Sequence, residues 1–362
     1  MQALVLVGGE GTRLRPLTLT QPKPAVPLVD RPFIRYMVDW LARHGVDDVI
    51  LACGFKADLL RERLGEGGDG GPLIRYVEEP EPLGTAGPIR FAADLLDDRF
   101  LTLNGDVLTD LDLTALIRQH ADRGAAGTLA LYPVDDVTGY GVVRRRDDGE
   151  ILEFLEKPDP ADADTDEINA GAYVLERSVL DLIPAGRAVS IEREVFPRLV
   201  GHGLYGRRLE GYWMDIGTPE RYLQATWDIL TGRVETETGR RLESDGLLVE
   251  DGVRVDPSAT VNAPALLEHG AEIGPNAAVG PRVVIGRGTE VASRAVARDS
   301  VIMNGCWIGP EAKVEGSILA SGVRIGEGAT VPAGSVVGEG AQIDPRATLE
   351  PDARVLPGRV AT

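Results

Sequence analysis

Cysteine is scarce in this chain, which has only Cys53 and Cys306 among its 362 residues. The two lie far apart in different kinds of sequence, so two buried thiols in a reducing compartment are favoured over a disulfide, although the pair could form one. No apolar run approaches the roughly 18 residues of a membrane-spanning helix, and the N-terminus enters an apolar run at once, without a basic leader. The sequence therefore predicts a cytoplasmic protein with no membrane partner.

Positive charge is also in short supply, because 38 lysines and arginines face 57 aspartates and glutamates and leave a net charge of −19. This balance argues against nucleic acid as a partner. An anionic small substrate would need a local cationic pocket, and a divalent metal would help to offset the overall field. The sequence offers no Ser-His-Asp or Cys-His grouping that demands a side-chain nucleophile.

The N-terminal stretch carries the clearest chemical signal. An apolar run from Leu4 to Val7 breaks into clustered glycines, as a buried strand does when it feeds a tight loop. Bare glycine backbone can approach a ligand closely, and successive N–H groups can cradle an anion. Three cations follow: Arg13, Arg15 and Lys23. We therefore predict a polyphosphate site here.

Other interpretations of this stretch explain less of it. The dinucleotide pattern G-x-G-x-x-G is nearly met, but Leu14 stands where the third glycine belongs, and no Gly-Lys-Ser/Thr of a Walker A motif follows. A plain glycine turn between strand and helix would explain the glycines but not the cations.

Strands and helices alternate after this loop. Helical apolar spacing covers 33–44, a second strand covers 46–52, a second helix covers 56–64 and a third strand covers 73–77. Such alternation predicts parallel β-α units in a mostly parallel, Rossmann-like sheet. Ligands of such sheets bind beyond the carboxyl ends of the strands, where the glycine loop would lie.

Several later carboxylates could serve such a site. Glu81 lies in a Pro- and Gly-rich loop and could accept hydrogen bonds from N1 and N2 of guanine, or it could be part of a solvated acidic loop. Asp106 ends a strand and could hold Mg²⁺, although a lone aspartate there is as often a cap or turn residue. Asp215 lies between apolar residues, where a buried charge needs a metal or a cation.

A sugar phosphate could be bound by a second group of residues. Glu156 offers an acceptor for sugar hydroxyls beside Lys157, a cation for the phosphate, although an exposed ion-pair turn is the commoner meaning of Glu-Lys. Asn169, just before a strand, could add a sugar contact.

Together these elements resemble the sugar-phosphate nucleotidyltransferases, also called nucleotide-sugar pyrophosphorylases. The matching segments occur in the family's order and cover residues 1 to about 230: 8–16, 22–24, 105–106, 156–158, 169–171 and 213–219. Residues 81–87 and 190–197 look most like those of mannose-1-phosphate guanylyltransferases. The alternative within the family is a glucose-1-phosphate thymidylyl- or uridylyltransferase, and a non-catalytic regulatory or scaffold protein is the alternative outside it.

The resemblance implies a role for individual residues. It implies an NTP, best GTP, bound by Leu6, Gly8, Gly9, Gly11, Thr12, Arg13, Lys23, Glu81, Gly84 and Thr85. It implies a sugar-1-phosphate, best mannose-1-phosphate, bound by Gly141, Glu156, Lys157 and Asn169. Asp106 and Asp215 would hold Mg²⁺, and with Arg13 and Lys23 they would be the catalytic residues.

The second half of the chain is a repeat. From Val249 to Val355 apolar residues recur at every sixth position, with steps of five to Val296 and to Leu319. A six-residue period predicts a parallel β-helix of roughly six coils with about 18 residues each. Its left hand is implied by resemblance to hexapeptide-repeat domains.

The expected domains are a nucleotidyltransferase domain at 1–232, a linker at 233–246 and the β-helix at 247–358. We expect the β-helix to be structural and to drive homo-oligomer formation, because exposed coil faces and an open final coil favour assembly. An acyltransferase is the alternative, for which His269 is the only histidine available in the repeat.

Overall fold

The structure is a computed structural model of the chain, and it describes all residues except 55, 69, 163 and 243–245. The chain divides into two compact units. Unit 1 consists of Met1–Gly9 and Met37–Trp213, and unit 2 consists of Glu10–Tyr36 and Met214–Thr362. The N-terminal glycine stretch is therefore shared between the units, because the division falls after Gly9.

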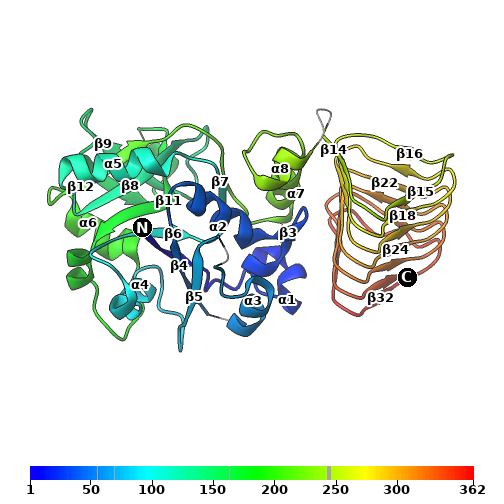
Figure 1. Cartoon of the computed structure of the whole chain (residues 1–362), viewed down its shortest axis with the longest axis horizontal. Helices are drawn as coiled ribbons and strands as arrows, with labels where there is room; N and C mark the ends of the chain where they lie inside the picture. The colour runs from blue at the N-terminus through cyan, green and yellow to red at the C-terminus, as the bar shows by residue number, and fades with distance from the viewer. Residues whose placement is uncertain (55, 69, 163, 243–245) are drawn as a thin grey trace. The chain divides into compact units, whose positions relative to one another are not determined.

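Unit 1 is built on a mixed sheet (Figure 1). Its main strands, in the order in which they pair, are β10 (Ile151–Glu156), β9 (Gly141–Arg145), β11 (Glu167–Glu176), β6 (Arg99–Asn104), β1 (Gln2–Leu6), β4 (Asp48–Cys53) and β5 (Leu73–Glu78). Strand β8 (Gly127–Pro133) pairs with β11 and with β12 (Leu204–Arg208). Strands β6, β1, β4 and β5 run parallel, which confirms the predicted β-α units, whereas β11 runs antiparallel to β6 and opens the other half of the sheet.

The two predicted helices, at 33–44 and 56–64, are confirmed as α2 and α3, and the described residues form further helices that were not predicted. The helices are α1 (Leu17–Thr20), α2 (Phe33–Arg43), α3 (Ala57–Leu64), α4 (Gly87–Phe91), α5 (Leu113–Arg123), α6 (Phe196–Leu199), α7 (Pro219–Leu230) and α8 (Glu237–Arg241). Helix α5 has a typical cap at each end. At its start Asp112 accepts a hydrogen bond from the Ala115 N–H, and after its end Gly124 has a φ of 56°. The core of unit 1 includes Phe100 and Tyr173, both fully buried.

The repeat folds into a left-handed parallel β-helix, as predicted (Figure 1). One face consists of β14 (Leu247–Val249), β17 (Ala265–Leu267), β20 (Val283–Ile285), β23 (Val301–Ile302), β26 (Ile318–Leu319), β29 (Val336–Val337) and β31 (Arg354–Val355). The second consists of β15 (Arg254–Val255), β18 (Glu272–Ile273), β21 (Glu290–Val291), β24 (Trp307–Ile308), β27 (Arg324–Ile325), β30 (Gln342–Ile343) and β32 (Val360–Ala361). The third consists of β16 (Thr260–Val261), β19 (Ala278–Val279), β22 (Val296–Arg298), β25 (Lys313–Glu315) and β28 (Thr330–Val331).

The apolar period builds the β-helix core directly. Leu267 pairs with Ile285, one full coil further along the chain, and both side chains are fully buried. Burying an aliphatic side chain of this size contributes roughly 1.5–3 kcal/mol, so every coil adds a similar increment to the same continuous core.

One step of the predicted period is placed wrongly. The sequence pattern puts Val296 at the core position of its strand, but Ala297 pairs with Val279 and is fully buried, while Val296 is only half-buried. The five-residue step therefore lies between Ala297 and Ile302. The sequence pattern assigned the core position to the larger valine, whereas the small apolar alanine occupies it.

The two short steps form two short corners that lie one above the other. The first contains Asp299 and Ser300, and the second contains Gly316 and Ser317. The Ser317 N–H donates to Ser300 Oγ at 3.0 Å, and the Gly316 N–H donates to the Arg298 carbonyl oxygen at 3.1 Å. Both serines are fully buried, so the short corners are linked by internal hydrogen bonds.

The segment expected to be a plain linker has structure of its own. Within 233–246, of which 243–245 lie outside the described residues, helix α8 starts at the cap Thr236, whose Oγ1 accepts from the Gly239 N–H at 2.9 Å. Thr238 is fully buried. This helix was not predicted, because the segment is polar and has no apolar period. Side-chain hydrogen bonds stabilise the helix instead.

Three further expectations can be compared with the structure. Cys53 and Cys306 are both free and buried, as predicted, and burial raises the pKa of each thiol to about 12. The His269 ring bonds through Nδ1 to the carbonyl oxygen of Asp251 at 2.6 Å, so this nitrogen has a structural partner. Across the described part of the chain, no helix is both long and apolar enough to cross a bilayer.

A buried carboxylate in the first coils should make stability depend on pH. Burial raises the pKa of Glu268 from 4.5 to about 7, and its side chain is only 5% exposed. A folded-state pKa above the unfolded value means that the stability is fully present below pH 4.5 and is lost as pH rises through 7, by up to about 3 kcal/mol. Glu268→Gln should therefore raise the melting temperature at pH 8 and leave it unchanged at pH 4.5.

Thermal unfolding of both proteins at the two pH values measures this difference. Glu311→Gln is the matched control, because Glu311 is an exposed partner of Arg294 on the same β-helix and should show no such pH-dependent gain. Equal gains for Glu268→Gln at both pH values would contradict the prediction.

Candidate active site

In unit 1 the carboxyl ends of the parallel strands come together at glycines. A Cβ added at Gly8, after β1, would lie 3.0 Å from Glu79 Oε1, and one added at Gly54, after β4, would lie 2.9 Å from the Gly8 carbonyl oxygen. A Cβ added at Gly9 would meet nothing within 4 Å. The first turn of the loop is thus packed closely against neighbouring strands, whereas Gly9 faces open space.

Gly105 brings Asp106 to the same edge. The Gly105 N–H donates to the Leu6 carbonyl oxygen at 2.9 Å, and a Cβ at this position would lie 2.7 Å from that oxygen. Only glycine therefore lets β6 turn this tightly beside β1. The turn places the half-buried Asp106 between β6 and β7 (Val107–Thr109), at the carboxyl end of a parallel strand as predicted.

The Pro- and Gly-rich loop that carries Glu81, the predicted guanine contact, covers residues 78–88 and is called the base loop below. It is held by a segment that lies far along the chain. Thr85 Oγ1 donates to Glu192 Oε2 at 2.6 Å and accepts from the Ile191 N–H at 2.9 Å. Gly84, with a φ of 77°, forms an isolated parallel bridge with Val189. The hydroxyl proton of Thr85 is therefore used within the protein, and this residue fixes the loop.

Two acidic residues of this loop differ in their surroundings. Glu81, the predicted guanine contact, is exposed. Glu79 is half-buried next to Gly8 and accepts from the Leu83 N–H at 3.1 Å, and burial raises its pKa. Glu79 is therefore the carboxylate of this loop that lies beside the glycine turn, a position that sequence reasoning missed.

Three of the predicted sugar-phosphate residues come together on the β9–β10 hairpin. Glu156 pairs with Gly141 across the two strands, and a Cβ at Gly141 would lie 2.9 Å from Glu156 Oε2. Lys157 Nζ lies 3.8 Å from Glu156 Oε1, and its side chain is 57% exposed. Its φ of 51° turns the chain out of the strand. The hairpin thus presents a carboxylate and an adjacent exposed cation.

Asn169 lies beside the buried Tyr173, which feels the charges of Glu156 and Asp106. Asn169 Nδ2 donates to the Tyr173 hydroxyl at 2.9 Å, and its Oδ1 accepts from the Gly171 N–H at 3.0 Å, so its side chain is held by β11 itself. Burial raises the pKa of Tyr173 well above its ordinary value, and the charges of Glu192, Glu156 and Asp106 add to this effect. These three carboxylates therefore share the surroundings of Tyr173.

In unit 2 the end of the glycine stretch, at Gly11, packs against Lys23. Residues 23–32, which begin at this lysine, are called the Lys23 segment below. Gly11 has a φ of 62° and precedes the short 3₁₀ turn η1 (Thr12–Leu14). A Cβ at Gly11 would lie 3.0 Å from Lys23 Cβ, and Thr18 Oγ1 donates to the Gly11 carbonyl oxygen at 2.9 Å. Leu14 is 1% exposed, so it is a core residue and not a replaced phosphate-binding glycine.

Arg13 and Asp215 both lie next to Gly217. A Cβ added at this glycine would be 2.8 Å from Arg13 Nη2 and 3.4 Å from Asp215 Oδ2. Asp215, at the end of β13 (Trp213–Asp215), also forms an ion pair with Arg221 on α7, and its side chain is 18% exposed. Unit 2 thus combines two arginines with one carboxylate.

Each unit, taken by itself, offers carboxylates, cations and bare backbone to a ligand, but few groups for a metal. Among the residues that the structure describes, no group of three or more His, Cys, Asp or Glu side chains could hold a metal ion. A cation here would therefore need ligands from substrate and water, as Mg²⁺ commonly does when one or two carboxylates and phosphate oxygens bind it. Sequence reasoning named the main carboxylates but missed Glu79, Glu192 and Arg221; Glu192 lies inside the quoted segment 190–197.

Comparison with known families accounts for nearly the whole chain. Residues 2–232 match the family "Nucleotidyl transferase", and residues 261–361 match the family "GMPPB C-terminal domain".

Individual relatives extend this similarity. A mannose-1-phosphate guanylyltransferase of Mycobacterium tuberculosis is 40% identical over 337 residues, which cover 91% of this chain and 83% of that protein. A mannose-1-phosphate guanyltransferase of Candida albicans is 41% identical over 269 residues, 72% of this chain and 73% of that protein. Among solved structures, HddC from Yersinia pseudotuberculosis is similar with a TM-score of 0.55 and 30% identity, covering 63% of this chain and 98% of that one.

Proposed function

The chain belongs to the nucleotidyl transferase family, and we propose that it transfers a guanylyl group from GTP to mannose-1-phosphate, giving GDP-mannose and pyrophosphate. The observation that carries this proposal is the similarity to relatives of that name, which in one case extends over 91% of the chain. The exposed Lys157 beside Glu156 supports a sugar-phosphate substrate. We take residues 1–232 as the catalytic domain.

The proposed reaction needs no side-chain nucleophile. A phosphate oxygen of the sugar-1-phosphate attacks the α-phosphorus of GTP, and the bond from that phosphorus to the β-phosphate oxygen breaks to release pyrophosphate. Catalysis then depends on holding two anions in line and neutralising the charge that develops. We assign Arg13 and Lys23 to the departing pyrophosphate and Lys157 to the sugar phosphate.

Backbone and side chains divide the binding of GTP between them. The open space at Gly9 supports close approach of the triphosphate, and Gly8, Gly11 and Thr12 extend the same backbone. Leu6 precedes this loop at the end of β1. Gly84 and Thr85 shape the base loop, and we keep Glu81 as the proposed guanine contact, with the half-buried Glu79 next to the glycine turn.

We propose a divalent metal as part of the site. Asp106 and Asp215 would hold Mg²⁺, and the ion would neutralise phosphate charge and activate the α-phosphorus toward attack. We propose Mg²⁺ because this ion is commonly bound by one or two carboxylates together with phosphate oxygens and water, which GTP and solvent would supply. Arg221 orients Asp215 through their ion pair.

Pyrophosphate release over a grid of nucleoside triphosphates and sugar-1-phosphates tests the function. We expect release to be fastest with GTP and mannose-1-phosphate in the presence of Mg²⁺. Faster release with dTTP or UTP and glucose-1-phosphate would move the chain to the alternative specificity. No release with any pair would favour a regulatory protein that binds sugar nucleotides without turnover.

We further propose a cytoplasmic homo-oligomer that binds small molecules and no nucleic acid. The two buried free thiols support a reducing compartment, and the net charge of −19 disfavours nucleic acid. The end of the β-helix exposes Leu356 and Val360, at 49% and 57%, which supports assembly through the last coil. Light scattering of the purified protein measures the oligomeric state.

A further inference from the structure

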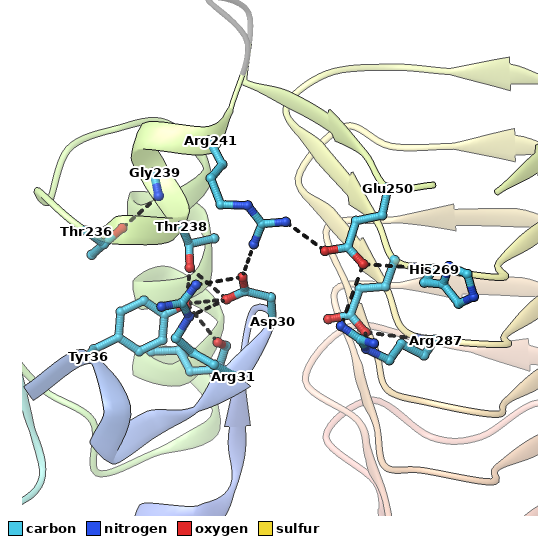
Figure 2. A network of polar contacts seen from close by, with 12 residues as sticks. Asp30, Arg31, Tyr36, Thr236, Thr238, Gly239, Arg241, Glu250, His269 and Arg287 are labelled. Carbon is cyan, nitrogen blue, oxygen red and sulfur yellow. Dashed lines mark hydrogen bonds and ion pairs between the residues drawn. The ribbon is translucent and has the colours of Figure 1, made fainter. Parts of the chain in front are cut away.

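Arg241, the last residue of α8, bridges two carboxylates that lie far apart in the sequence (Figure 2). Its Nη1 donates to Asp30 Oδ2 at 2.9 Å, and its Nη2 donates to Glu250 Oε1 at 2.8 Å. Asp30 follows β2 (Pro27–Leu28), and Glu250 follows the first strand of the β-helix. One guanidinium therefore joins the hairpin after Lys23 to the first coil.

The Asp30 end of this bridge is buried and fully engaged. The Asp30 side chain is only 4% exposed, and it accepts hydrogen bonds from Arg31, Tyr36 and Thr238 besides Arg241. Burial opposes its ionisation, but the hydrogen bonds from Arg31, Thr238 and Tyr36 together with the charge of Arg31 more than offset this and lower its pKa. Because it is buried and charged, this carboxylate depends on its cationic partners.

The Glu250 end is anchored inside the β-helix. Glu250 Oε2 accepts from the His269 N–H of the next coil at 3.0 Å, and Arg287 Nη2 lies 3.8 Å away. Arg287 in turn donates its backbone N–H to Glu268 at 3.0 Å (Figure 2). The anchor of Arg241 thus belongs to the stacked coils, which form one continuous core.

The hairpin that Asp30 closes leads directly to Lys23. Lys23 opens the 3₁₀ turn η2 (Lys23–Ala25), which is followed by β2 and by β3 (Arg31–Pro32), whose two strands pair with each other. The Tyr222 hydroxyl of α7 donates to the Pro27 carbonyl oxygen. The Lys23 segment is therefore supported by α7 at one point and by Arg241 at the other.

We propose that Arg241 is a positioning residue for the reaction, through which the first coil of the β-helix holds the Lys23 segment in its reactive placement. The inference rests on the proposed function, in which Lys23 meets the departing pyrophosphate. The planar guanidinium suits this role because its fork can hold two carboxylates in fixed directions at once. A lysine can hold one of them but cannot fix both directions.

Arg241→Ala should lower kcat/KM roughly ten- to thirtyfold, with most of the loss in kcat, because a displaced cation harms the transition state more than GTP binding. Arg241→Lys should recover part of the loss. Arg240→Ala is the matched control: Arg240 is its neighbour on α8 and pairs with the exposed Glu235 and Glu237, so its loss should leave turnover unchanged.

Hydrogen exchange of the full chain gives a readout that does not need turnover. In Arg241→Ala, the amides of residues 25–33 should exchange faster, while those of the coils after residue 290 keep their protection; Arg240→Ala should change neither. Glu250→Gln, which keeps a hydrogen-bond acceptor, should give the same pattern in weaker form.

The outcomes distinguish a failure of the positioning role of Arg241 from a failure of the proposed function. Unchanged exchange at 25–33 together with unchanged kcat in Arg241→Ala would overturn the positioning role. A loss of kcat that Arg240→Ala reproduces would overturn it as well. If the wild-type chain releases no pyrophosphate from any substrate pair, the proposed function fails, while the exchange comparison still decides whether Arg241 holds the hairpin.

Discussion

Asp106→Asn and Asp215→Asn should each lower kcat by about a thousandfold or more and leave the fold intact. Replacing a carboxylate by an amide removes the charge that would hold Mg²⁺ at the transferring phosphate, and electrostatic stabilisation of this kind accounts for several kcal/mol of a barrier. The amide is nearly the same size, so the packing after β6 and β13 should be preserved. Pyrophosphate release at saturating substrates and a titration with Mg²⁺ measure the effect.

Asp112→Asn serves as the control for both variants. Asp112 caps helix α5 through the Ala115 N–H, and asparagine caps a helix equally well, so turnover should stay at the wild-type level. Near-normal turnover in Asp106→Asn or Asp215→Asn would remove that residue from the proposed metal site. Because Asp215 also pairs with Arg221, thermal unfolding of the Asp215→Asn protein must accompany its kinetics.

Gly217→Ala should lower kcat by about ten- to a hundredfold without loss of stability. The added methyl group would lie 2.8 Å from Arg13 Nη2, which is the end of a flexible side chain, so the guanidinium moves while the backbone stays in place. The variant therefore displaces the Arg13 guanidinium from its place beside Gly217 without removing its charge. Steady-state kinetics and thermal unfolding of the same preparation measure the two effects.

A double variant decides whether Gly217 acts through Arg13. If it does, adding Gly217→Ala to Arg13→Ala should cost almost nothing more, because the displaced group is already gone. Losses that multiply in the double variant would mean that the methyl group disturbs the site by another route.

The sequence predicted those parts of the fold whose signals are local. The β-helix could be predicted because each coil contacts its neighbours at a fixed spacing. Its core residues therefore recur at a regular interval along the sequence. The parallel strands of unit 1 could be predicted because each is a short apolar run that ends at a glycine or an acidic residue. Even there, the small size of Ala297 hid the true core position of one strand.

What could not be predicted lies in contacts between distant segments. Glu192 reaches Thr85 from 107 positions away, and Arg241 reaches Asp30 from 211 positions away. No period or motif ties such partners together. Helix α8 was missed for a related reason: besides its local cap at Thr236, it is held by the hydrogen bond that Thr238 donates to Asp30, 208 positions away, and not by an apolar face of its own.

The short corners of the β-helix show how such a chain can change in length without losing its core. The two short corners bond to each other, since the Ser317 N–H donates to Ser300 Oγ at 3.0 Å. On their other sides they meet full-length corners through backbone bonds, from the Asp299 N–H to the Pro281 carbonyl oxygen at 2.9 Å and from the Gly334 N–H to the Gly316 carbonyl oxygen at 2.8 Å. The core strands beside these corners keep their register, with Ile285 opposite Ile302 and Leu319 opposite Val337. Changes of one residue in chain length should therefore be tolerated at this vertex of the triangle.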